Sequence, residues 1–462
     1  MDISAAVTRG ADQGDARSGK DLPGACAAAT ADCRQLRVRT VPARHAGGLL
    51  ARLHGPGPLA WTRRGDGLIG WGEAAVISVS AGADRFRVAE RALGGLFGAA
   101  ETEDRVGIPG CGPVAFGSFT FDSARGGSVL VIPRVVLGRR DGVEWVTTIE
   151  AIARGAAAVG GLPPPPAPEP ARGGNGLTAA GWERAVAAAV TRIRGGSLRK
   201  VVLARSLQVA TEEPIHVIGA LEVLAGRDPD CYVFACAGLI GATPELLIQR
   251  VGRQVRSRVI AGTAARGYRP AEDTAASASL LASPKETEEH LYAVESVRQA
   301  LAPLCDHLIA DARPSVICLA DTHHLATTIS GTLAAPASAL TLAGLLHPTA
   351  AVCGTPPGAA MDTIRELEHM DRGRYAGPVG WMDARGDGEW GLALHCGEVD
   401  GSRVRLFAGC GIVAGSDPAA EAAEAEAKFQ PMLRALGLRP GPVGTGPSAT
   451  TVPPQRLPRP VC

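Results

Sequence analysis

The stretch "LRKVVLARSLQVA" (residues 198–210) is typical of a β-strand, because apolar residues alternate with others from Val201 to Val209. The stretch "ASPKETEEHLYAVESVRQALAPLC" (282–305) has the other period, with apolar residues every three or four positions, as on one face of a helix. Patterns of these two kinds alternate from Leu177 to about Leu438. This half of the chain therefore predicts an α/β fold.

The rest of the chain divides by composition. The N-terminal half carries short β-type runs such as "GSVLVIPRVVL" (127–137), separated by glycine-rich turns, and is expected to form mainly sheet. A run rich in proline and glycine, "GLPPPPAPEPARGGNG", then interrupts any helix or strand. The predicted segments are a disordered tail (1–34), a sheet-rich N-terminal part (35–160), a connector (161–176), a region of helices and strands (177–437) and a second disordered tail (438–462).

Charge and cysteine content exclude several classes of protein. The 462 residues include 47 Lys and Arg against 46 Asp and Glu, so no basic field is expected to attract nucleic acid or an acidic membrane. No apolar run approaches the roughly 18 residues of a membrane span. The 11 cysteines lack a Cys-x-x-Cys motif, and no secretion signal precedes them, which favours reduced thiols in the cytoplasm.

Three residues have side chains that suit proton transfer. Lys200 opens the predicted strand at 198–210, and Glu245 in "GATPELLIQR" (241–250) lies at the start of another apolar run. His324 precedes the alternating run in "HHLATTISG". Taken singly, each has an ordinary alternative: a strand-edge lysine, a solvent-facing carboxylate and a core histidine.

The helix at 282–305 has a marked start. Ser283 is the expected N-cap and Glu286 its capping-box partner, while Leu291 belongs to the predicted apolar stripe. Glu286 and Glu289 share a face, where two carboxylates can hold Mg²⁺ or simply favour the helix dipole.

A second helix is expected at 416–436, capped by Ser416 or Asp417. Glu421, Glu424 and Lys428 fall at i, i+3 and i+7, so they share one helical face. That face suits either a cation site or a solvated set of ion pairs.

Nine stretches, in this order, resemble the chorismate-utilising enzymes, the family of anthranilate, aminodeoxychorismate, salicylate and isochorismate synthases. The resemblance covers about residues 177–437 and implies an α/β fold with large antiparallel β-sheets packed as a sandwich, helices outside and the site in the cleft between the sheets. It also implies a chorismate-binding catalytic region, a monomer and no nucleotide or flavin. The stretches are "KVVLAR", "GATPELL", "IAGTAARG", "SPKETEEH", "HHLATTISG", "LHPTAAVCGTP", "RYAGPVGWMD", "AGCGIV" and "SDPAAEAAEAEAK".

Within this family, three features resemble the members that use water instead of an amine. Lys200 matches their lysine base, "SPKETEEH" matches their helix, and Ala351 stands where isochorismate-forming members have a small aliphatic residue. The implied reaction is the Mg²⁺-dependent conversion of chorismate to isochorismate. Two alternatives remain: a salicylate synthase, and a non-catalytic chorismate-binding protein.

The resemblance also implies a role for each site residue. Lys200 would activate water, Glu245 would protonate the leaving C4 hydroxyl, and His324 would lie beside the ring. This requires a neutral lysine and a protonated carboxyl group, hence a lowered pKa and a raised one. The residues implied to bind substrate are Gly262, Thr263, Ala351, Tyr375, His395, Gly409 and Lys428, and those implied to hold Mg²⁺ are Glu289 and Glu424, with Glu286 and Glu421 acting through water.

One residue departs from the family pattern. In "GLALHCGEV", His395 stands where the family has an arginine that binds the pyruvyl carboxylate. A histidine binds a carboxylate well only when protonated, so the apparent KM is expected to rise between about pH 6 and 8. His323 and His347 are expected to be structural.

Overall fold

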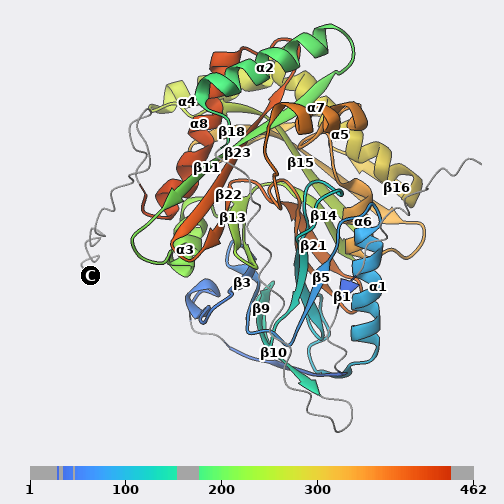
Figure 1. The fold of residues 1–462 in the computed structure, drawn as a ribbon. Coiled ribbons are helices and arrows are strands. Elements are labelled where there is room, and N and C mark those ends of the chain that lie inside the picture. The colour runs from blue at the N-terminus through green and yellow to red at the C-terminus, as the bar shows by residue number, and fades with distance from the viewer. Residues whose placement is uncertain (1–28, 31–34, 45–46, 153–175, 439–462) are drawn as a thin grey trace, which may run out of the picture.

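The computed structural model describes residues 29–30, 35–44, 47–152 and 176–438. Over these residues the chain forms two large β-sheets with helices outside them, as expected for the fold class (Figure 1). The predicted connector up to residue 175, the C-terminal tail from residue 439 and most of residues 1–34 lie outside the described residues. Within 1–34, Ala29–Thr30 forms the short strand β1 and pairs with β5.

The larger sheet has 12 strands in the order β19-β11-β23-β22-β13-β12-β3-β4-β9-β10-β2-β6, and its pairs are antiparallel except β2 with β6. Its strands are β2 (Gln35–Pro42), β3 (Leu59–Arg63), β4 (Asp66–Trp71), β6 (Glu101–Asp104), β9 (Val135–Arg140), β10 (Val143–Ile152), β11 (Lys200–Ala210), β12 (Tyr232–Cys236), β13 (Leu239–Thr243), β19 (Gly354–Thr355), β22 (Cys396–Asp400) and β23 (Arg403–Ile412).

The second sheet has 11 strands, antiparallel throughout its described pairs, in the order β1-β5-β8-β7-β20-β21-β14-β15-β18-β16, with β17 also paired to β18. Besides β1, its strands are β5 (Ala75–Val79), β7 (Val114–Ser118), β8 (Ser128–Ile132), β14 (Leu246–Val251), β15 (Gln254–Ala265), β16 (Cys305–Ala310), β17 (Ser315–Cys318), β18 (Thr322–Leu333), β20 (Pro378–Asp383) and β21 (Gly388–Leu392).

The helices cover the outer faces of these sheets. Helices α2, α3, α7 and α8 contact the 12-stranded sheet, α4, α5 and α6 contact the 11-stranded one, and α1 contacts strands of both. In Figure 1, α2, α4, α5, α7 and α8 gather at one end of the molecule, and β9 and β10 lie at the other. Their bounds are α1 (Arg85–Gly98), α2 (Ala179–Arg194), α3 (Val217–Arg227), α4 (Pro270–Ala282), α5 (Pro284–Leu301), α6 (Ala339–Leu346), α7 (Pro357–Leu367) and α8 (Pro418–Ala435), with 3-10 turns at Leu50–Arg52 and Ala302–Leu304. Among these described helices, none is both long and apolar enough to cross a membrane.

The two halves of the chain share both sheets. Strand β3 pairs with β12, and β7 pairs with β20, so the N-terminal strands form one end of each sheet and join there to strands from after the connector. The sheet-rich segment at 35–160 is therefore continuous with the second half.

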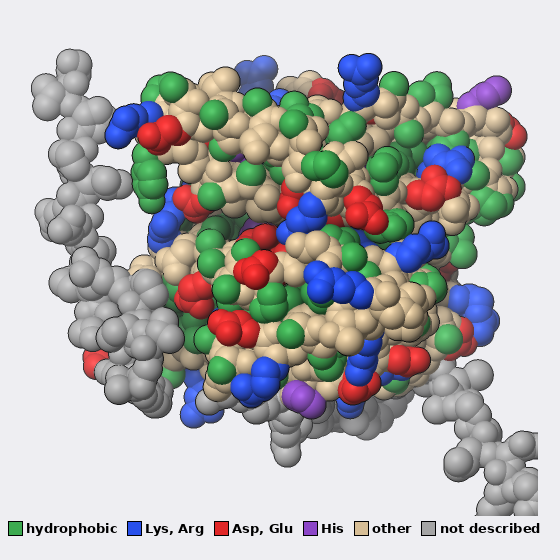
Figure 2. Space-filling model, turned by 90° about the horizontal axis from the view of Figure 1, so that it is seen from above, with side chains coloured by type: hydrophobic (Ala, Val, Ile, Leu, Met, Phe, Trp, Pro, Cys, Tyr) green, Lys and Arg blue, Asp and Glu red, His purple; other side chains and the backbone are tan. Residues whose placement is uncertain are grey.

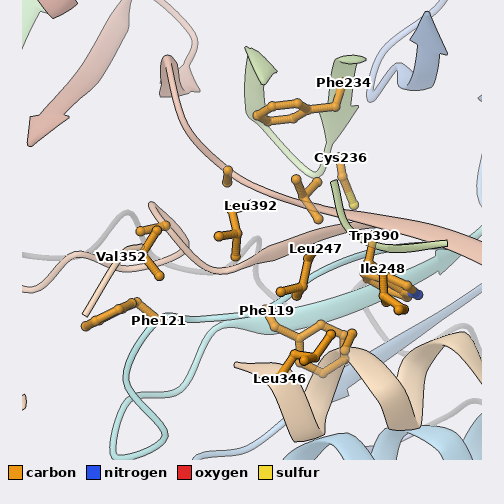
Figure 3. Close-up of a cluster of buried hydrophobic side chains, with 14 of the residues drawn as sticks. Phe119, Phe121, Phe234, Cys236, Leu247, Ile248, Leu346, Val352, Trp390 and Leu392 are labelled. Atoms are coloured by element: carbon orange, nitrogen blue, oxygen red, sulfur yellow. The ribbon is translucent and has the colours of Figure 1, made fainter. Parts of the chain in front are cut away.

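A large hydrophobic core contains buried side chains from both sheets and from the helices that pack on them. Figure 3 shows Phe119 near Trp390 and Leu346, and Phe121 near Val352. The rings of Phe119 and Trp390 meet edge to face with centroids 5.8 Å apart, an arrangement that aromatic quadrupoles favour. On the face seen from above, Figure 2 shows acidic and basic side chains interspersed with hydrophobic ones.

The helix caps are largely as predicted. The Ser283 hydroxyl accepts the Glu286 N–H, and the Asp417 carboxylate accepts the Ala420 N–H, so Asp417 is the cap of α8. The carboxylate of Glu286 accepts the N–H of Thr263 in place of the predicted capping-box contact.

The prediction that Leu291 faces the core is wrong, because its side chain is 59% exposed. The buried face of α5 runs instead through Glu289, His290, Ala293 and Val297. Two polar side chains therefore point inward at the start of this helix.

Candidate active site

A cavity with an empty volume of about 760 Å³, its open mouth included, lies between the two sheets. Its walls come from β11 and β23 of one sheet, from β15 and β18 of the other, and from α5 and α8. Eleven of the predicted site residues line it: Glu245, Gly262, Thr263, Glu289, His324, Ala351, Tyr375, His395, Gly409, Glu424 and Lys428. The other three, Lys200, Glu286 and Glu421, lie outside this lining and contact residues at its edge.

Lys200 is the first residue of β11, and its side chain is completely buried. Its ammonium nitrogen forms an ion pair with Glu289 Oε1 of α5 at 3.2 Å. Burial acts to raise the pKa of Glu289, but the ammonium groups of Lys200 and Lys428 outweigh it and hold the pKa below its ordinary value. The cavity wall thus carries an ionised carboxylate beside a buried lysine.

Glu245 lies in the two-residue gap between β13 and β14 and is only 3% exposed. Its own N–H is held by the Thr243 hydroxyl at 3.2 Å. Burial raises the pKa of its carboxyl group to about 8, although the charge of Lys200 acts against the shift. Glu245 therefore keeps its proton at neutral pH, as the expected acid must.

His324 lies in β18 with a hydroxyl group beside each ring nitrogen. Nδ1 is 3.2 Å from Thr263 Oγ1, and Nε2 is 2.8 Å from Thr322 Oγ1. Burial lowers its pKa to about 3, so the ring is neutral. The two hydroxyls fix the plane of the imidazole at the cavity wall.

Lys428 of α8 provides a second positive charge that acts on Glu289. Its ammonium group lies 2.6 Å from Glu424 Oε1 and donates to the Gly409 carbonyl at 2.9 Å. Burial acts to lower the pKa of Lys428, but Glu424 and its neighbours raise it above the ordinary value. This site lysine is therefore a fixed positive charge.

Glu286 and Glu421 form the outer part of the cluster. Both approach the ammonium group of Lys285, at 3.5 Å and 2.9 Å. Burial raises the pKa of both carboxyl groups, and a neighbouring glutamate adds to each shift. A bound cation reduces the repulsion between carboxylates that lie this close together.

The residues present suit a hard divalent cation. Carboxylate oxygens from α5 and α8 converge on the cavity, and carboxylates are the ligands that Mg²⁺ uses. Gly411 of β23 leaves the room they need, because a Cβ at that position would collide with the carboxylate of Glu289. The predicted ligands Glu289 and Glu424 both line the cavity, so the donor set fits the expected ion.

His395 lines the cavity with a backbone φ of 43°, in the left-handed region. Burial lowers its pKa to about 4, and the positive charge of Lys428 adds to this shift. This lowered pKa argues against a change in the charge of His395 between pH 6 and 8 in the protein without ligand, because a buried imidazole beside a lysine resists protonation, and the expected rise of KM stays a prediction.

Tyr375 and Gly409 form one wall together. The Tyr375 ring stacks on Phe407 with centroids 5.0 Å apart, and a Cβ at Gly409 would lie 2.9 Å from the Tyr375 hydroxyl. Glycine therefore leaves that hydroxyl accessible from the cavity.

Ala351 lies in the turn before β19. His347 contacts the Phe121 carbonyl at 2.9 Å, outside the cavity lining, as expected of a structural residue. His323 bonds Asp273 at 2.8 Å, also outside the lining.

Sequence reasoning missed the buried pair of Arg372 and Glu368. The Arg372 guanidinium lines the cavity and donates to the carbonyls of Val202 and Val352 at 2.7 Å and 2.9 Å. Glu368 accepts the Ala204 N–H at 2.8 Å. This pair joins β11 to the turn that carries Ala351. Arg372 lies nine positions before Trp381 in the sequence, and no local pattern marks it. Its contacts in the folded chain show that it links β11 to the cavity.

Comparisons with known proteins identify the family of this chain. The chorismate binding enzyme family matches residues 59–437. The isochorismate synthase DhbC of Bacillus subtilis is 42% identical over 269 residues, covering 56% of this chain and 68% of that protein. An inferred isochorismate synthase, MenF, of Mycobacterium tuberculosis is 39% identical over 343 residues, covering 71% of this chain and 88% of that protein. The solved structure of an inferred 2,3-dihydroxybenzoate-specific isochorismate synthase, DhbC, of Bacillus anthracis is 33% identical, with a TM-score of 0.69 over 84% of this chain and 98% of that one.

The sandwich of sheets and the cavity between them define an enzyme of the chorismate-utilising fold. The chain belongs to the chorismate binding enzyme family, and the resemblance first seen in its nine stretches is confirmed.

Proposed function

We propose that this protein is an isochorismate synthase that converts chorismate to isochorismate in a Mg²⁺-dependent reaction. Relatives with that activity in their names support the proposal, as does the match of the family to residues 59–437. The observation that carries it is the buried carboxyl group of Glu245, whose pKa of about 8 keeps a proton donor in the cavity that is also lined by Glu289, the ion-pair partner of Lys200.

The reaction needs an acid and a base at two positions of one ring. Water attacks C2 and gives a proton to Lys200, which takes part in this step as the neutral amine, the double bonds shift, and the C4 hydroxyl leaves as water with a proton from Glu245. No atom is gained or lost overall. A protonated Glu245 suits this role, because an ionised carboxylate has no proton to donate.

The substrate is a dicarboxylate, and the cavity offers it cationic and hydroxyl partners. Lys428 is a fixed charge, and the Tyr375 hydroxyl lies beside Gly409. His395 is neutral and can donate one hydrogen bond. His324, held by Thr263 and Thr322, would lie against the ring.

Glu289 and Glu424 would hold Mg²⁺, with Glu286 and Glu421 reaching it through water. When bound, the cation supplies positive charge that offsets the ring carboxylate. The chain itself contributes the four carboxylates and the room at Gly411.

The deciding experiment is incubation of the purified chain with chorismate and MgCl₂, followed by chromatography of the products. Isochorismate as the sole product is expected. Salicylate and pyruvate would replace the proposal with salicylate synthesis, and calorimetric binding of chorismate without any product would support a binding protein.

A further inference from the structure

The chain crosses from the 12-stranded sheet to the 11-stranded sheet at Pro244 and Glu245. Strand β13 ends at Thr243 in the first sheet, and β14 begins at Leu246 in the second. The two residues between them are buried and belong to neither sheet, so regular strand pairing does not hold their backbone. Buried backbone polar groups need other partners at such a crossing. Those partners determine where the carboxyl group of Glu245 lies.

Arg258 of β15 supplies one of these partners. Its guanidinium donates to the Pro244 carbonyl from Nε, at 3.0 Å, and from Nη2. The Glu245 N–H is the other polar atom of the same planar peptide group, and it donates to the Thr243 hydroxyl at 3.2 Å. The peptide group that precedes the side chain of Glu245 is therefore held at both of its polar atoms.

Arg258 is itself fixed by contacts with both sheets. It lies opposite Leu246 in the pairing of β14 with β15, and the neighbouring Ser257 hydroxyl donates to the Leu246 carbonyl at 3.2 Å. Its guanidinium carbon lies 5.9 Å from the centre of the Tyr232 ring of β12, and Nη2 reaches the Asp230 carbonyl at 3.4 Å. The guanidinium group therefore joins the two sheets beside the crossing.

The same side chain carries a charge that acts on Glu245. Burial raises the pKa of Glu245 to about 8, and the positive charges of Lys200 and Arg258 both act against this shift. The other charged side chains that line the cavity are Glu289, Arg372, Glu424 and Lys428. A neutral residue in place of Arg258 would therefore raise the pKa of Glu245 further.

We propose that Arg258 is the positioning residue of Glu245, because it holds the Pro244 carbonyl where the chain changes sheets and so directs the carboxyl group into the cavity. This inference deepens the proposed function and rests on it for the role of Glu245 as the acid. A displacement of about 1 Å in a reacting group can cost about 10²-fold in rate. The contribution of Arg258 therefore belongs to turnover more than to binding.

The first test compares kcat and KM of Arg258→Gln with those of the parent. The variant should lower kcat by about 10- to 100-fold and leave KM within about twofold, because a misplaced acid matters only in the transition state. The alkaline limb of kcat should also move to higher pH, because a positive charge that lowers the pKa of Glu245 is lost. A merely structural role would lower kcat without moving this limb.

Two further variants separate position from charge. Arg258→Lys keeps the charge but loses the fork of two donors, so it should keep the parent's alkaline limb and lose less kcat than Arg258→Gln. Arg256→Gln is the matched control, since Arg256 is exposed on the same strand two residues earlier, and it should behave like the parent. Melting curves check that each variant folds, and if Arg258→Gln does not, the loss of kcat in Arg258→Lys decides. Values of kcat in the folded Arg258 variants equal to that of Arg256→Gln would overturn the proposal.

The second test needs neither chorismate nor Mg²⁺. It follows the infrared carbonyl band of the protonated Glu245 carboxyl group against pH, with the band identified by its loss in Glu245→Gln. In Arg258→Gln this band should shift or broaden and persist to higher pH. A band unchanged in frequency, width and pH dependence would overturn the proposal, whatever the substrate is. A shifted band in a protein that does not convert chorismate would support the positioning of Glu245 by Arg258 and reject the proposed reaction.

Discussion

The ammonium nitrogen of Lys200 lies 3.2 Å from Glu289 Oε1, and the lysine side chain is completely inaccessible to solvent. One residue opens a strand and the other lies in the second turn of α5, so the contact joins a sheet to the helix outside its partner sheet. The expected base and an expected metal ligand therefore form one ion pair, and removal of either charge leaves the other without its partner.

Lys200→Met should lower turnover by about 10²-fold or more, because a general base contributes on that order. Methionine fills the buried volume but leaves Glu289 without its closest cation, so thermal stability should fall as well. Steady-state kinetics and a melting curve measure the two effects.

Lys285→Met provides the control for this variant. Lys285 also pairs with a buried glutamate, but its side chain is 33% exposed and its partner is Glu421, whereas Lys200 is completely buried against Glu289. We expect it to retain most of the turnover. Equal losses in the two variants would remove Lys200 from the role of base.

Glu245 should make the stability of the protein depend on pH. Burial raises the pKa of its carboxyl group from the ordinary 4.5 to about 8, so the folded state binds this proton more tightly than the unfolded state does. Its contribution to the free energy of unfolding is undiminished below about 4.5 and is lost as the pH rises through about 8. Glu245→Gln should abolish this part of the slope in denaturant titrations at several pH values, and should cost turnover about 10²-fold or more. A parallel pH dependence in parent and variant would refute the raised pKa.

His395 should behave as a neutral hydrogen-bond donor. Since its pKa is about 4, the apparent KM for chorismate should not follow a histidine titration between pH 6 and 8, and His395→Gln should leave KM close to that of the parent. His395→Arg should lower KM by about 10- to 100-fold, the equivalent of the 1.5–3 kcal/mol of a hydrogen bond to a charged group. Profiles of KM against pH for all three proteins measure this. A KM of His395→Gln that exceeds the parent's at pH 6 alone would show that bound substrate protonates the histidine.

Removal of Mg²⁺ with EDTA should abolish turnover, and added Mg²⁺ should restore it. Glu424→Gln should abolish turnover at any Mg²⁺ concentration tested, because one of the proposed ligands is lost. Glu426→Gln is the matched control on the same helix, since Glu426 is 43% exposed and pairs with Arg205 at 3.6 Å. Full activity in EDTA would contradict the metal site.

Much of this architecture could be predicted from local sequence. The caps Ser283 and Asp417 could be predicted because capping depends on the side chains of a single turn. The start of β11 at Lys200 could be predicted because the alternation of apolar residues begins there. The predicted burial of Leu291 failed because the periodicity of α5 is compatible with more than one buried face. The elements that pack against α5 determine which face is buried, and here that face includes Glu289.

The pairings within the site could not be predicted from the residues alone. Lys200 meets Glu289, and Arg372 meets the carbonyls of Val202 and Val352, only after strands distant in sequence have come together. The raised pKa of Glu245 is likewise a property of its burial, which no local pattern specifies. The resemblance to a family supplied the roles of these residues, and the structure supplied their partners.

The sharing of both sheets by the two halves of the chain has a consequence for synthesis on the ribosome. Val114 of β7 pairs with Asp383 of β20, a residue translated roughly 270 positions later. At about 5–20 residues per second, the inner edge of β7 waits roughly 13–54 s for its neighbour. During that interval the apolar run of β7 and β8 is a nascent sheet with an open edge, the state in which a growing chain most needs a chaperone.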